Sequence, residues 1–139
     1  MSSIDTIQNE IIEEFSLFDD WMDKYEYIID LGKSLPLIDE RYKDEEHLIR
    51  GCQSRVWLHA ERHEETVGFT ADSDAVITRG LIALIIRVLN RQPAADIAHS
   101  DLYFIDRIGL QEHLSPTRAN GLRSMVKQMK LYGLAFSGV

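Results

Sequence analysis

Residues 51–58 read Gly51-Cys52-Gln53-Ser54-Arg55-Val56-Trp57-Leu58 and place the only cysteine of the chain between a turn and an apolar, strand-like run. Because glycine lets the backbone turn sharply, the tip of such a turn can hold a thiol where another protein reaches it. A single cysteine excludes, within this chain, a disulfide, a CxxC redox pair and a multi-cysteine zinc or iron–sulfur site. Cys52 is therefore either a small buried apolar residue or a solitary working sulfur.

The residues that follow this turn predict an antiparallel hairpin. Two segments with strand character, Val56–Glu61 and Thr66–Ala71, flank the polar residues Arg62–Glu65. The second segment alternates in the way expected of a half-buried strand. The charged residues from Leu37 to Arg50 lack a sustained period, so we expect a loop there, with a short strand at His47–Ile49. The predicted sheet is small and antiparallel, with about three strands.

Apolar residues recur at helical spacing both before and after the hairpin. We expect helices at Ile4–Phe18, with Ser2 or Ser3 as N-cap; Asp20–Leu31, ended by Gly32 and Pro36; Ala75–Asn90, preceded by turn and N-cap residues Asp72-Ser73-Asp74; Pro93–Ala98; Leu102–Ile108; and from Pro116, capped by Ser115, to a C-cap at Gly133. The segment Ala75–Asn90 is apolar nearly all round, which is typical of a helix buried in the middle of a fold. N-terminal helices, a small sheet and packed C-terminal helices predict an α+β fold.

Length and composition limit the organisation of the chain. With 139 residues, 45% of them apolar, the chain is expected to form one domain, residues 1–139, with its own core. The first residues lack the pattern of a signal peptide, and the longest apolar run, Gly80–Ile86, is too short to span a bilayer. We therefore expect a cytoplasmic protein that does not bind membranes.

The net charge of -8 is distributed unevenly. Residues 1–50 carry 14 Asp and Glu against 5 Lys and Arg, whereas residues 107–139 carry 1 against 5. An acidic chain repels phosphate backbones, so nucleic acid is not an expected partner.

Cys52 has neighbours that bear on its chemistry. Arg50 and Arg55 are close in sequence and would favour the thiolate if their side chains faced it, which these offsets do not require. A Cys-dependent hydrolase or transferase would also need a base. The histidines available for that role are His47, His59, His63, His99 and His113. Nothing in their spacing selects one of them, and the same scatter predicts no metal site.

Arg118 stands apart from the other basic residues. It lies in the first turn of the last predicted helix, where a cation opposes the helix dipole. Such a placement indicates a specific anionic partner, which Asp72 or Asp74 at another helix start could supply. The alternative is an ordinary solvated arginine.

Four motifs then occur in a familiar order. They are Lys24-Tyr25-Glu26-Tyr27-Ile28-Ile29-Asp30-Leu31-Gly32 with Leu35-Pro36; Gly51-Cys52-Gln53-Ser54-Arg55-Val56-Trp57; Asp72-Ser73-Asp74-Ala75 leading into Gly80-Leu81-Ile82-Ala83; and Leu114-Ser115-Pro116-Thr117-Arg118 leading to Gly121-Leu122. From about Trp21 to Met129 the chain resembles the SufE family of sulfur acceptors.

The resemblance implies a role in iron–sulfur cluster assembly. Family members accept sulfane sulfur from a pyridoxal-phosphate (PLP) cysteine desulfurase, of the SufS or CsdA type, and stimulate that enzyme. The implied fold is shared with cluster scaffolds of the IscU/NifU type, and a scaffold complex is the implied sulfur recipient. The resemblance further implies an accessory carrier with no cofactor of its own, because PLP belongs to the desulfurase. We expect a monomer or a weak homodimer.

The resemblance also assigns roles to residues. Cys52 is the implied persulfide carrier, and Gly51, Gln53 and Ser54 shape its loop. Asp74 and Arg118 match positions that restrain this loop and take part in docking. In resting relatives the loop holds its cysteine in an apolar pocket. The alternatives are a Cys-dependent hydrolase or transferase acting on small substrates, and a binding module in which Cys52 is only a filler.

Overall fold

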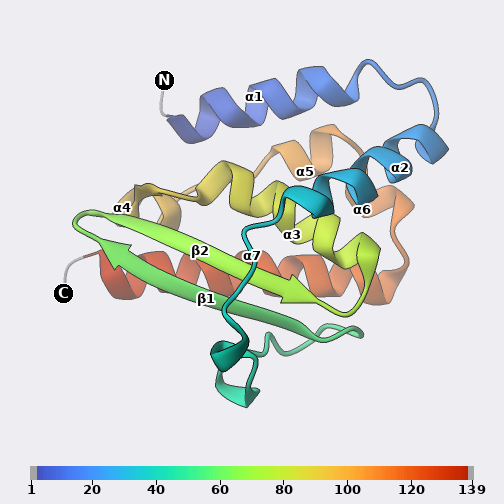
Figure 1. Cartoon of the computed structure of the whole chain (residues 1–139). Coiled ribbons are helices and arrows are strands. Elements are labelled where there is room, and N and C mark those ends of the chain that lie inside the picture. The colour runs from blue at the N-terminus through green and yellow to red at the C-terminus, as the bar shows by residue number, and fades with distance from the viewer. Residues whose placement is uncertain (1–2, 138–139) are drawn as a thin grey trace.

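The computed structural model describes residues 3–137 and shows an α+β fold (Figure 1). Its helices and strands are α1 Ser3–Phe15, α2 Trp21–Leu31, β1 Val56–His63, β2 Thr66–Ser73, α3 Val76–Leu89, β3 Gln92–Pro93, α4 Ala94–Ala98, α5 Phe104–Arg107, α6 Leu110–His113 and α7 Pro116–Phe136. Three single-turn 3-10 helices, η1 Gly32–Ser34, η2 Glu40–Tyr42 and η3 Glu45–His47, lie in the connection from α2 to β1.

The predicted hairpin is confirmed and is longer than expected. β1 and β2 pair antiparallel from Val56 opposite Ser73 to His63 opposite Thr66. Alternate residues of both strands are buried, which gives the sheet one covered face. In Figure 1 the hairpin runs alongside α7, and α3 lies between the hairpin and α1. The turn that holds Cys52 leads directly into β1, so the hairpin places this turn at the surface of the helical layer.

Helix α3 is the centre of the molecule, as its apolar sequence predicted. It contacts α1, α2, β2 and α7, and ten of its residues are buried. The closest crossing is at Gly80, because a Cβ there would lie 2.0 Å from the backbone oxygen of Ile28 in α2. One continuous apolar cluster connects α1, the sheet, α3 and α7.

Two strand predictions need correction. The segment His47–Ile49 is not a strand: η3 ends at His47, and Leu48 makes only an isolated bridge to Trp57. Asp44 caps η3 through its side chain, which stabilises the turn there instead. The third strand is Gln92–Pro93, paired with Val67 and Thr66, so Pro93 precedes α4 rather than occupying its first turn.

The ends of the helices also differ from prediction. Gly133 does not end the last helix, which continues to Phe136. A Cβ at Gly133 would lie 2.9 Å from the backbone of both Ala94 and Ala98, so glycine there allows α7 to pack closely on α4. For α1, Ser3 is already helical, and Ser2 lies outside the described residues.

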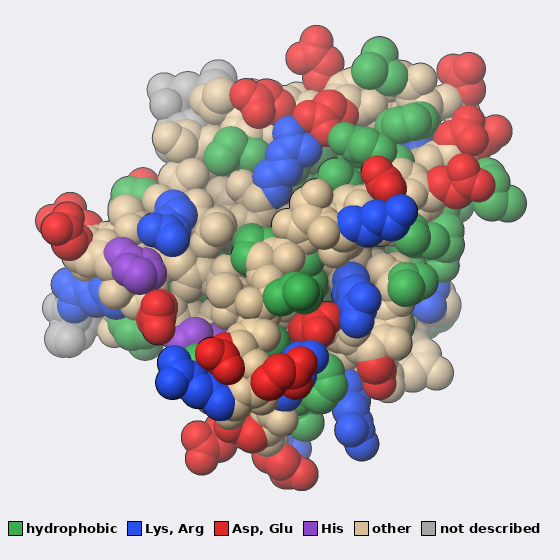
Figure 2. Space-filling view, viewed as in Figure 1, with side chains coloured by type: hydrophobic (Ala, Val, Ile, Leu, Met, Phe, Trp, Pro, Cys, Tyr) green, Lys and Arg blue, Asp and Glu red, His purple; other side chains and the backbone are tan. Residues whose placement is uncertain are grey.

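The predicted charge asymmetry is visible on the surface. Figure 2 shows acidic side chains gathered along the top of the view, over α1 and α2. Within residues 3–137, no helix has the length and apolarity needed to cross a membrane.

Candidate functional site

The Cys52 turn is closed at its base by the sheet. The backbone N–H of Ile49 donates to the carbonyl of Val56 at 2.8 Å, and Leu48 bridges to Trp57. Gly51 adopts a φ of 90°, in the left-handed region that favours glycine. The chain between Ile49 and Val56 therefore folds back on itself as a turn, and Cys52 lies next to the tip of that turn.

Cys52 is half-buried against α7. Its thiol donates to the carbonyl of Gly121 at an Sγ–O distance of 3.6 Å, a weak hydrogen bond. A Cβ on Gly121 would lie 3.4 Å from Sγ, which places the sulfur in van der Waals contact with this position of the helix. A small cavity of about 20 Å³ adjoins the thiol, lined also by Thr78 of α3 and by Thr117 and Met125 of α7.

Burial raises the pKa of the Cys52 thiol above its ordinary value. Burial is the cause of this shift, and neither Arg50 nor Arg55 offsets it in the described arrangement. Both arginines are exposed, so water screens their charges. Burial thus favours the protonated thiol over the thiolate in this arrangement.

Gln53 and Ser54 line the same small cavity as Cys52. Gln53 is exposed and Ser54 is half-buried. The structure thus brings together the loop residues that the sequence had grouped, on the surface of α7.

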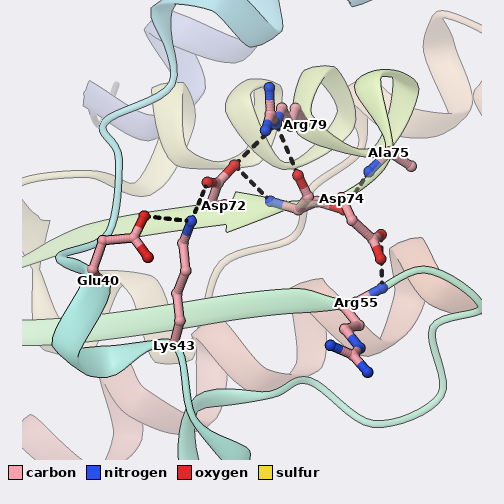
Figure 3. Close-up of polar contacts among 8 residues, drawn as sticks. Glu40, Lys43, Arg55, Asp72, Asp74, Ala75 and Arg79 are labelled. Carbon is pink, nitrogen blue, oxygen red and sulfur yellow. Dashed lines mark hydrogen bonds and ion pairs between the residues drawn. The ribbon is translucent and has the colours of Figure 1, made fainter.

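Asp74 holds the far end of the loop (Figure 3). Its Oδ1 accepts from the backbone N–H of Arg55 at 3.0 Å, and its own N–H donates to the Arg55 carbonyl at 3.3 Å. The prediction that the Asp72-Ser73-Asp74 side chains include the N-cap of α3 needs correction. The N-cap residue is Ala75, which has no side-chain cap, and the carboxylate of Asp74 bonds to the loop instead.

Arg118 lies at the Cys52 cavity but without the predicted anionic partner. Its Nη1 donates to the hydroxyl of Tyr25 at 3.4 Å, and its backbone N–H donates to the N-cap Ser115. Asp72 pairs with other cations and Asp74 accepts from the Arg55 backbone, so neither carboxylate meets Arg118. Arg118 thus presents its charge beside the thiol and the loop.

The model of the family described as "SufE: Fe-S metabolism associated domain" matches residues 9–132. The chain belongs to the SufE family. The family description associates it with iron–sulfur metabolism, and the α+β fold agrees with this membership.

Three relatives carry the family label in their names. An uncharacterised SufE-like protein of Rhizobium etli is 44% identical over 135 residues, which are 94% of this chain and 88% of the relative. Another, of Rhizobium meliloti, is 42% identical and covers 94% of each chain. SufE-like protein 1, chloroplastic/mitochondrial, of Arabidopsis thaliana is 39% identical over 87% of this chain, but only 33% of that longer protein is covered.

A solved structure matches the fold. It is the solution structure of a hypothetical protein from Thermus thermophilus, with a TM-score of 0.77 and 15% sequence identity. The match covers 94% of this chain and 95% of the other. At this identity the likeness concerns the fold alone.

The histidines of this SufE-family chain lie away from the thiol. The rings of Tyr42 and His59 stack with their centroids 3.9 Å apart, and Nδ1 of His59 lies 3.4 Å from Nε2 of His47. No histidine lines either cavity that Cys52 borders. In the described arrangement no histidine therefore adjoins the thiol as the base of a Cys–His pair would. Within the part of the chain that the structure describes, no group of three His, Cys, Asp or Glu could hold a metal ion.

Sequence reasoning missed part of the site. Thr78 and Met125 line the thiol cavity, and their roles depend on how α3 and α7 pack. Gly121 and Thr117 stood within a family motif, which was the available signal. The ion pair of Asp72 with Lys43, at 2.8 Å, joins segments too far apart in sequence to be paired by spacing. The pair with Arg79, at 2.9 Å, depends on how the start of α3 lies against the end of β2.

Proposed function

We propose that this chain accepts sulfane sulfur on Cys52 from the persulfide of a PLP-dependent cysteine desulfurase, of the SufS or CsdA type. In this role it stimulates desulfurase turnover and carries sulfur toward iron–sulfur cluster assembly, with a cluster scaffold complex as recipient. The observation that supports this most strongly is the placement of Cys52. The only cysteine sits at the tip of a surface turn, half-buried, beside a cavity and bonded weakly to Gly121.

The transfer is an exchange between sulfur atoms. The Cys52 thiolate attacks the outer sulfur of the donor persulfide, and a new S–S bond forms as the S–S bond of the donor breaks. The electron pair of the broken bond stays on the donor sulfur, which leaves as a thiolate. Cys52 then carries one additional sulfur, and the reaction needs no outside oxidant or reductant.

The same geometry supports a two-position loop. In the described arrangement burial raises the pKa of the thiol, so Cys52 reacts slowly with molecules in solution. A docking partner would draw the turn away from α7 by breaking the weak contact to Gly121 and the bonds to Asp74. On return, the cavity of about 20 Å³ offers room for about one additional atom beside Sγ.

The proposal is tested by replacing the reactive atom. In Cys52→Ser, transfer of radioactive sulfur from labelled cysteine, through the desulfurase, to this chain is expected to vanish. The fold is expected to persist, because serine is nearly the same size, and circular dichroism checks this. Wild-type protein whose Cys52 has been alkylated is the matched control and should also accept nothing. Label on the Cys52→Ser chain would refute the proposal.

A further inference from the structure

A buried carboxylate and two cations join three parts of the chain next to the Cys52 turn (Figure 3). Asp72, at the end of β2, is only 6% exposed. Nζ of Lys43, which follows η2, lies 2.8 Å from its Oδ2, and Nε of Arg79 on α3 lies 2.9 Å from its Oδ1. Because a buried carboxylate is costly unless it is paired, this cluster fixes the end of β2 against α3.

The cluster continues without a break into the next two residues. The N–H of Ser73 donates to Asp72 Oδ1, and its carbonyl accepts from Arg79 Nε at 2.8 Å. The hydroxyl of Ser73 accepts from the N–H of Ala75 at 3.3 Å. Ser73 is 1% exposed, so its backbone has little freedom. The direction in which Asp74 leaves this turn is therefore set by the residues before it.

Asp74 is the point at which the turn meets the loop. Its carboxylate and N–H both bond to the backbone of Arg55, three residues after Cys52. Opening of the loop must break this pair of hydrogen bonds. The position of Asp74, and hence the cost of opening, depends on how firmly residues 72–73 are held.

We infer that Arg79 is a positioning residue for sulfur transfer: it holds the 72–74 turn so that Asp74 keeps the Cys52 loop closed until a partner docks. The inference rests on the proposed function. Arg79 is singled out over Lys43 because its Nε meets both the Asp72 carboxylate and the Ser73 carbonyl, whereas Lys43 meets Asp72 and the exposed Glu40. Arg79 therefore acts on the backbone of the turn itself.

The test measures how often Cys52 is exposed in the protein alone. The rate of its alkylation by iodoacetamide is measured under native conditions for wild type, Arg79→Met and Lys43→Met. Loss of a hydrogen bond that closes the loop is expected to raise the rate about threefold to tenfold in Arg79→Met. Lys43→Met is expected to raise it less, because the bond from Arg79 to Ser73 remains.

A matched control separates this effect from general destabilisation. Arg87 lies on the same helix and pairs with Glu14, at 2.9 and 2.5 Å, away from the Cys52 loop. Arg87→Met should lower the denaturation midpoint in urea while leaving the alkylation rate near that of wild type. An equal rise in Arg79→Met and Arg87→Met would overturn the inference.

A double-mutant cycle tests the route through Asp74. Asp74→Ala removes the carboxylate bond to Arg55 but keeps the bond from the backbone N–H. In this background Arg79→Met is therefore expected to raise the alkylation rate by a smaller factor than it does in wild type, although its effect on urea stability persists. If Asp74→Ala and Arg79→Met each multiply the alkylation rate by the same factor alone and together, the inference is contradicted. Arg79→Lys, which keeps the charge near Asp72, is the second variant if Arg79→Met fails to fold. The alkylation rate of Cys52 in Arg79→Lys should lie between the rates of wild type and Arg79→Met.

These rates need no desulfurase, so they are independent of the test of the proposed function. If Cys52 accepts no sulfur, the proposed function fails whatever the alkylation rates are. If Cys52 accepts sulfur but Arg79→Met alkylates no faster than Arg87→Met, only the role of Arg79 fails.

Discussion

Gly51 gives the Cys52 turn a backbone conformation that other residues rarely adopt. Its φ is 90°, and a Cβ there would lie 2.7 Å from Oγ of Ser124 on α7. Gly51→Ala is therefore expected to lower the free energy of unfolding by about 1–2 kcal/mol, as measured by urea denaturation, and to speed alkylation of Cys52.

A second variant identifies the cause of that loss. Ser124→Ala in the Gly51→Ala background removes the nearby hydroxyl but leaves the strained φ. We expect only a small recovery of stability. Full recovery would show that crowding, and not the backbone conformation, makes glycine necessary at position 51.

Individual residues of the site were predictable where their role is local. The roles of Cys52 and its neighbours were predictable because the only cysteine follows Gly51 in a turn and because these residues form a family motif. The partners of Arg118 and Asp74 did not follow, because they depend on which segments meet in three dimensions. Arg118 contacts Tyr25, 93 residues away in sequence, and no spacing rule identifies such a pair.

Among the elements, α3 depends on one glycine. Alanine favours a helix over glycine by about 1 kcal/mol, so propensity alone predicts that Gly80→Ala stabilises the protein. The close backbone of Ile28 predicts the opposite, a loss of about 3 kcal/mol or more. Thermal or urea denaturation distinguishes these outcomes by sign.

The neighbouring position Ala83 provides the control for Gly80. It lies on the same helix and is only partly buried. Ala83→Gly should cost about 1 kcal/mol from helix propensity alone. A Gly80→Ala variant that is as stable as wild type, or more so, would contradict the close crossing of α2 and α3.

Long elements, and the short helices α4 and α5, were predictable from the sequence, whereas β3 and α6 were not. The periodic segments became α1, α2, α3 and α7, and the alternating segments became β1 and β2. The two-residue β3 and the four-residue α6 have no period to detect. The end of α7 was misplaced because Gly133 serves packing on α4, which in a sequence looks the same as a helix stop.

At the scale of the whole molecule, Arg87 joins the central helix to the first helix through ion pairs with Glu14 and, more distantly, Glu10. Arg87 on α3 bonds Glu14 on α1 through both carboxylate oxygens, and Tyr27 on α2 donates to the same carboxylate at 2.5 Å. The bond from Arg87 lowers the pKa of Glu14 to about 2, against the opposing effect of partial burial.

This pKa shift predicts how stability depends on pH. A carboxyl with a lowered pKa contributes stability that is complete above the ordinary value of 4.5 and is lost as pH falls toward about 2. Glu14→Gln should therefore lose about 1–2 kcal/mol at pH 7, after allowance for solvent screening, and less at pH 3. Urea denaturation at both pH values measures the difference.

Glu13 is the matched control for this prediction, since it is exposed on the same helix. Glu13→Gln should change stability little at either pH. A Glu14→Gln variant whose loss is the same at pH 7 and pH 3 would contradict the coupling of Glu14 ionisation to Arg87.

The fold class of the whole molecule was predictable, because the spacing of apolar residues along the sequence indicates which segments form helices and which form strands. The resting position of the thiol was not. It results from a turn, a helix backbone and a buried ion cluster that meet only after folding. Family membership connects these features to iron–sulfur metabolism, and the sulfur chemistry remains the proposal to test.

The most direct test is peptide mass spectrometry of the wild-type protein after incubation with a SufS-type desulfurase and free cysteine. We predict a gain of one sulfur atom on the peptide that contains Cys52, and a thiol reductant should remove this added sulfur. An unmodified Cys52 peptide, recovered while the desulfurase carries a persulfide on its own cysteine, would contradict it.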